Sequence, residues 1–301
     1  MKKLIIILTG IVLAAAVIAT GTYGLTQKNI DIYERAAAID SSVTGCEDFA
    51  VTDYPVAFYD GEYDYVLTWK NGNYNIDRRV PVISFAAATA YPIDGHYEVL
   101  APTVEKMSSL LGIMSMGEAE YGIEEQVATI WHEAFHCRQL TYYYDNITGI
   151  CSEDIDESII SEYVDTNTQV VELFTEQSEL LEKAVKCEDI DTLRGYMIKY
   201  KQLDMQRKAL LSKDINELEE YYTIVEGTAC YVEACVYRAE LPDRFDEEYI
   251  DNIGVYRKGS SKYYRSGMAQ CMILDKLSAE WKNEFDFSEP LTDIIYRELE
   301  I

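Results

Sequence analysis

The sequence has few basic residues and few histidines. It holds 26 lysines and arginines against 53 aspartates and glutamates, which gives a net charge of −27 over 301 residues. Phosphate backbones are repelled by such a charge, so the composition argues against nucleic-acid binding and against a polybasic membrane-surface role. Internal repeats and low-complexity tracts are also missing. With 48% hydrophobic residues, the composition is that of a folded globular chain.

The seven cysteines do not form the pattern of a structural zinc site. Four residues separate Cys230 from Cys235, but no second cysteine or histidine pair follows them. In an oxidising compartment some cysteines would pair, and an odd number leaves at least one outside any intramolecular disulfide. The spacing does not determine the connectivity.

The longest hydrophobic run stands at the N-terminus. After Lys2 and Lys3, no charged side chain occurs from Leu4 to Gln27. Two lysines before an apolar stretch are typical of an export signal. The stretch is long for a cleaved signal and just long enough for a spanning helix, so residues 1–27 are predicted to be a signal peptide or a membrane anchor. Either reading places the rest of the chain outside the cytoplasm, secreted or tethered to the membrane.

Two further regions differ in pattern. Residues 28–110 contain short runs rich in Val, Ile, Tyr and Phe, with tight-turn signals at Asp60-Gly61 and Asn71-Gly72. They predict a small, mostly antiparallel sheet with strands at Pro55–Tyr59, Tyr63–Trp69, Val80–Ala86 and Tyr97–Leu100. Residues 111–301 are predicted to be a helical subdomain. Its expected helices are Ile123–Tyr143, Ser158–Cys187, Thr192–Ser212, Ile215–Ala239 and Ser266–Lys282. The fold class expected is therefore α+β.

The strongest chemical signal is the string His132-Glu133-Ala134-Phe135-His136, an HExxH motif. On a helix, two histidines four residues apart project from one face, so both imidazoles can reach one metal ion. The intervening Glu133 lies beside the open position of the metal and can take a proton from a bound water. The alternative is an exposed helix with two incidental histidines.

A catalytic zinc usually has three protein ligands. The remaining histidine, His96, lies in a turn of the predicted sheet, and no further histidine follows His136 at a suitable spacing. Glu226 is the better candidate, because its neighbours Val225, Gly227 and Ala229 are apolar or small and favour burial. The small residues would also let its helix approach the histidine helix closely.

HExxH followed by Glu-Gly-x-Ala-x-Tyr-x-Glu at residues 226–233 resembles the gluzincin metallopeptidases, most closely the aminopeptidase N-like branch. The resemblance covers the two helices, Ile123–Tyr143 and Ile215–Ala239. It implies a thermolysin-like zincin fold, Zn²⁺ held by His132, His136 and Glu226, and Glu133 as general base. The long spacer before Glu226 contains two of the predicted helices, so an inserted helical hairpin is expected. The family's Gly-x-Met-Glu-Asn substrate-anchoring motif is not present, and Val225 replaces the family's Asn.

Two further residues are candidates for supporting roles. Gluzincins often use a Tyr or His as oxyanion donor, and of Tyr256, Tyr263 and Tyr264, which lie downstream of the third ligand, Tyr264 is the candidate for this role. Core or surface packing is the ordinary role of a tyrosine. Glu233 lies seven residues after Glu226. It would either orient a ligand histidine without binding the metal itself or form a surface ion pair.

These patterns predict an exported zinc peptidase that hydrolyses peptide bonds through a zinc-activated water, with peptides or proteins as substrates. The membrane would be a second partner if the N-terminal segment is retained. A non-catalytic surface binding module on the same scaffold is the main alternative, and a purely structural helical protein is a third.

Overall fold

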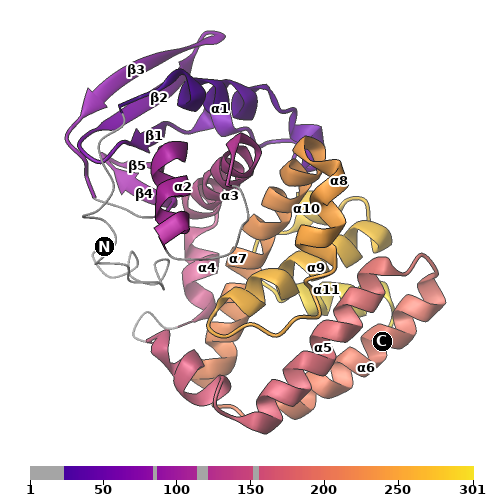
Figure 1. Cartoon of the computed structure of the whole chain (residues 1–301). Coiled ribbons are helices and arrows are strands. Elements are labelled where there is room, and N and C mark those ends of the chain that lie inside the picture. Colours follow the sequence, from indigo (N-terminus) through magenta and orange to yellow (C-terminus); the bar gives the residue numbers. More distant parts are fainter. Residues whose placement is uncertain (1–23, 84–86, 114–120, 152–155) are drawn as a thin grey trace. The chain divides into compact units, whose positions relative to one another are not determined.

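The computed structural model describes residues 24–83, 87–113, 121–151 and 156–301 (Figure 1). Most of the predicted signal or anchor segment lies outside these ranges. Among the described residues, no helix combines the length and the apolar character needed to cross a bilayer. All seven cysteines are present as thiols.

The described chain forms two compact units. The sheet unit comprises residues 24–142 with Cys235–Leu241, and the helical unit comprises Tyr143–Ala234 and Pro242–Ile301. One small mixed sheet and several helices make the architecture α+β, as the sequence predicts.

The sheet unit is built on five strands in the order β3-β2-β1-β5-β4. Their bounds are β1 Val56–Tyr59, β2 Asp64–Lys70, β3 Asn73–Arg79, β4 Thr89–Ile93 and β5 His96–Pro102. Three of the four pairings are antiparallel, and only β1 and β5 run parallel. All four residues of the central strand β1 are buried. The prediction of a mostly antiparallel sheet is therefore confirmed.

The strand predicted at Val80–Ala86 is wrong where it can be compared. Residues 80–83 form no strand, and 84–86 lie outside the described residues. The chain instead forms β3 before this segment and β4 after it. Asn71 and Gly72 both have positive φ, as a two-residue hairpin turn requires, and this turn pairs the polar β3 with β2. As an exposed edge strand, β3 needs no apolar run.

Helices complete the sheet unit. They are α1 (Gln27–Ala38), α2 (Val104–Ile113) and α3 (Ile123–Tyr142). Contacts of α3 with β5, β4 and α1 join it to the sheet. The helix that carries the HExxH motif therefore packs with the strands, although the sequence suggests a division near residue 110.

The helical unit begins with α4 and ends with α11. Its helices are α4 (Tyr144–Ile150), α5 (Thr168–Lys186), α6 (Ile190–Lys208), α7 (Lys213–Glu240), α8 (Pro242–Phe245), α9 (Ser261–Leu277), α10 (Trp281–Glu284) and α11 (Leu291–Glu298), with π-helical turns at Ile160–Val164 and Asp246–Ile250. The last turns of α7 belong to the sheet unit. Figure 1 shows α5 and α6 side by side as a hairpin, which agrees with the two helices predicted for the spacer.

The first predicted helix of this hairpin is interrupted. The chain becomes helical at Ser158, as the sequence predicts, and continues as the π-helical turn Ile160–Val164, but residues 165–167 are not helical and α5 begins at Thr168. The Asn167 side chain accepts a hydrogen bond from the Val170 amide (3.3 Å) and so caps α5. At this break the carboxyl of Asp165 binds another segment of the chain, residues 256–262.

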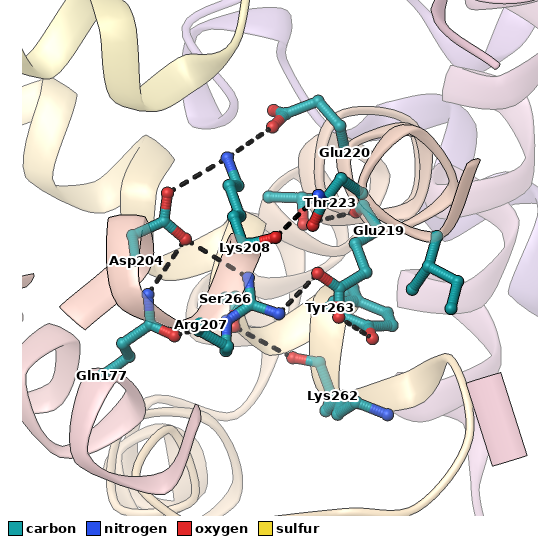
Figure 2. A network of polar contacts seen from close by, with 12 residues as sticks. Gln177, Asp204, Arg207, Lys208, Glu219, Glu220, Thr223, Lys262, Tyr263 and Ser266 are labelled. Carbon is teal, nitrogen blue, oxygen red and sulfur yellow. Dashed lines mark hydrogen bonds and ion pairs between the residues drawn. The ribbon is translucent and has the colours of Figure 1, made fainter. Parts of the chain in front are cut away.

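A buried polar network ties the hairpin to α7 and α9 (Figure 2). Arg207 of α6 is only 4% exposed and donates to Glu219 of α7, to Gln177 of α5 (2.7 Å) and to Asp204 (3.2 Å). Tyr263 of α9 donates to the other oxygen of Glu219 (2.6 Å). Buried charges are tolerated only when they are paired and hydrogen-bonded, and this network meets that condition.

A second buried carboxylate holds the segment before α9. Asp165 accepts hydrogen bonds from Tyr256 (2.6 Å), from the Gly259 amide (2.7 Å) and from Lys262 (2.9 Å). Burial raises the pKa of this carboxyl, but the three hydrogen bonds outweigh burial and hold the pKa below its ordinary value. The ionised form therefore stabilises the helical unit at neutral pH. That stabilisation is lost as pH falls through the depressed pKa of the folded state.

We predict that Asp165→Asn lowers the free energy of unfolding at pH 7 and that its difference from the wild type shrinks below about pH 3.9, the ordinary pKa of an unfolded aspartate. Urea denaturation at pH 7 and at pH 3 measures both quantities. Asp191→Asn is the control, because the Asp191 side chain is 89% exposed. A difference for Asp165→Asn that stays constant with pH would contradict the assigned role of this carboxylate.

Candidate metal centre

The histidine helix is buried along one side, as its apolar spacing predicts. Val127, Ile130, Trp131 and Ala134 are each fully buried, and the indole of Trp131 donates to the Ala36 carbonyl of α1 (3.1 Å). Glu124 and Glu125 occupy the first turn of α3, where negative charge interacts favourably with the helix dipole. Packing against the rest of the sheet unit therefore fixes the position of the HExxH segment.

His132 and His136 lie one turn apart and are 8% and 2% exposed. Their ring centroids are 4.8 Å apart, and the two Nε2 atoms are separated by 3.1 Å. In a tetrahedral zinc site with Zn–N bonds of about 2.0–2.1 Å, neighbouring ligand atoms are about 3.3 Å apart. The spacing of the two imidazoles is therefore close to that of two ligands of one zinc ion.

Glu226 of α7 is the acidic member of the same group. Its carboxylate is 2% exposed, and the ligand atoms of His132, His136 and Glu226 all lie within 4.8 Å of one another. Within the described ranges, no other group of three His, Cys, Asp or Glu side chains is found to meet this criterion. Two ligands of one tetrahedral zinc are about 3.3 Å apart, so the carboxylate would have to close by at most about 1.5 Å, a movement that a change of glutamate rotamer provides. The donor set of two imidazoles and one carboxylate fits zinc.

Glu226 is held by a close helix crossing. A Cβ atom on its neighbour Gly227 would lie 2.5 Å from the Cα of Gly267 in α9, and one on Gly267 would lie 2.0 Å from the Thr223 carbonyl oxygen. Only glycine fits at either position. Gly227 therefore serves the crossing of α7 with α9. The polar network of Figure 2 fixes α7 at Glu219, two turns before Glu226.

The remaining predicted residues have varied surroundings. Glu133 is half-buried, in contrast to the two buried histidines beside it. Glu233 accepts a hydrogen bond from Tyr249 (2.6 Å). Tyr264 is half-buried in the first turn of α9. The roles predicted for these three residues stay predictions.

The other tyrosines downstream of Glu226 have structural partners. Tyr256 donates to Asp165 and Tyr263 to Glu219, so neither hydroxyl proton is available to an oxyanion without breaking a buried contact. His96 contacts Glu98 on the sheet (3.0 Å). Cys137 directly follows His136, but burial raises the pKa of its thiol, and the charges of Glu133 and Glu98 raise it further. The thiol is therefore neutral at pH 7 and is not a nucleophile.

Gln139 belongs to the site, and the sequence motif does not reveal it. Its side-chain oxygen lies 2.6 Å from Nδ1 of His136, and both residues are buried. The available signal is a polar residue seven positions after His132, on the inward face of an amphipathic helix, because buried polar groups need partners.

No family model matches the chain, and no curated protein or solved structure resembles it closely enough to count as a match.

Proposed function

We propose that this protein is an extracytoplasmic zinc-dependent peptidase of thermolysin-like fold, in which His132, His136 and Glu226 hold the metal. The observation that carries the proposal is the grouping of these three buried side chains, with all three ligand atoms within 4.8 Å of one another. His132 and Glu226 come from distant parts of the sequence, and two imidazoles and a carboxylate buried together are the donor set that binds zinc. The N-terminal lysines and the apolar run support export.

The residues divide the chemistry between them. A bound zinc would supply Lewis acidity toward the scissile carbonyl and lower the pKa of water. Glu133 takes the proton of the attacking water and passes it to the leaving amine, a role that suits a half-buried carboxylate beside two buried ligands. Tyr264 is proposed as the donor to the developing oxyanion, and Glu233 as a residue that orients a ligand histidine.

Metal analysis tests the ligand set directly. The purified chain is expected to contain about one zinc, and His132→Ala, His136→Ala and Glu226→Ala are each expected to weaken zinc binding by more than about 100-fold. Loss of a direct ligand should weaken zinc binding more than loss of a residue that only hydrogen-bonds to a ligand. His96→Ala and Glu217→Ala are matched controls, since neither residue belongs to the group of three. Wild-type protein without zinc affinity would refute the proposal, and a Glu226→Ala variant with unchanged affinity would require another ligand.

Cleavage of a broad peptide library tests the activity. Zinc-dependent hydrolysis supports the peptidase, whereas a zinc-loaded protein that cleaves nothing would favour the non-catalytic binding module.

A further inference from the structure

The contact between Gln139 and His136 determines which nitrogen of the imidazole carries the proton. Gln139 stands three residues after His136 on α3, and its Oε1 atom lies 2.6 Å from Nδ1 of the ring. Gln139 is fully buried and His136 is 2% exposed, so water does not compete for the contact. An amide oxygen only accepts hydrogen bonds, and the ring nitrogen that faces it must therefore donate.

A proton on Nδ1 leaves the other ring nitrogen, Nε2, unprotonated. A neutral imidazole with its proton on Nδ1 has its lone pair on Nε2, and Nε2 of His136 is the atom that lies 3.1 Å from Nε2 of His132. A metal ion can bind only a nitrogen that offers a lone pair. In the opposite tautomer, Nε2 would carry a proton and the site would have to lose it before binding.

We propose that Gln139 is a positioning residue that holds His136 in the Nδ1-protonated tautomer and in the ring orientation that metal binding needs. The role of Gln139 in metal binding rests on the proposed function, whereas the tautomer of His136 follows from the contact alone. The acceptor is a neutral amide in a chain of net charge −27. It fixes the proton without adding a second buried carboxylate to a site that already contains Glu226.

Long-range ¹H–¹⁵N NMR of the metal-free protein tests the tautomer. The chain has only three histidines, so His96→Asn and His132→Asn assign the signals of His136 by elimination. In the wild type we expect the shifts of a protonated Nδ1 and an unprotonated Nε2. In Gln139→Leu we expect a mixture of tautomers, because the acceptor is lost while the volume is nearly kept. Unchanged shifts in Gln139→Leu would overturn the proposal.

Zinc affinity tests whether Gln139 supports metal binding. We expect Gln139→Leu to raise the dissociation constant for zinc by about 10–100-fold. Gln126→Leu is the matched control on the same helix: Gln126 is also fully buried, but its amide donates to the Pro102 carbonyl (3.3 Å). If Gln126→Leu weakens zinc binding as much as Gln139→Leu does, the effect is general loosening of α3 and the positioning role is refuted.

The two measurements separate the possible failures. A wild type that shows the Nδ1–H tautomer but does not bind zinc would refute the proposed function. The hydrogen bond from His136 to Gln139 would still stand. A wild type that binds zinc with unchanged affinity in Gln139→Leu would leave the proposed function standing and refute the positioning role.

Discussion

Peptide cleavage is expected to fall by about 10²–10⁴-fold in Glu133→Gln, the contribution typical of a general base. Glutamine has nearly the same shape as glutamate but cannot accept a proton from water. Glu133 is not one of the three proposed metal ligands, so the variant should still bind about one zinc. Steady-state cleavage of a peptide identified in the library screen, combined with metal analysis of the same sample, measures both quantities.

Glu124→Gln is the control for this variant, because Glu124 lies on the same helix and pairs with Arg35 (3.0 Å) away from the motif. It should cleave as the wild type does. If Glu133→Gln loses zinc together with activity, Glu133 acts on the metal and not on the water proton. Full activity in Glu133→Gln would exclude Glu133 as the base.

The second large effect is expected for the helical unit. Arg207→Met should lower its free energy of unfolding by about 3–5 kcal/mol, because removal of one partner leaves a buried charge uncompensated. Arg207 is the donor shared by Glu219, Gln177 and Asp204 (Figure 2). Urea denaturation of the variant and the wild type gives the difference.

Arg297→Met is the matched control, since Arg297 pairs with Glu289 but is 59% exposed. Exposed pairs contribute at most about 1 kcal/mol. Adding Glu219→Gln to Arg207→Met should recover part of the lost stability, because the uncompensated charge disappears. Equal losses for Arg207→Met and Arg297→Met would show that the network is not a buried ion-pair system.

Part of the site could be predicted because it depends on local spacing. His132 and His136 share a helix face by arithmetic alone, and the small and apolar neighbours of Glu226 indicate burial. The role of Gln139 is also local, yet a motif search stops at His136. A count of polar residues on the inward face of α3 would have found it.

The prediction and the structure differ where contacts between distant parts of the sequence determine the local structure. β3 is polar and exposed, and only its pairing with β2 makes it a strand. The helix expected from Ser158 is interrupted where Asp165 binds three donors in a segment about ninety positions away. Only glycine fits at position 227 because α9 packs against it, and no periodicity in α7 identifies α9 as the partner. Sequence spacing carries no information on which distant element a small residue will meet.

The contact of Gly227 with Gly267 also bears on how Glu226 would reach a bound ion. Gly227 adjoins Glu226 in the chain, and a contact at the level of α-carbon atoms leaves the peptide backbone there no room to drift. Glu226 would therefore reach an ion by rotation of its own side chain, a motion of picoseconds to nanoseconds, while its backbone stays in place. The entropic penalty for ordering that backbone is largely met when the chain folds.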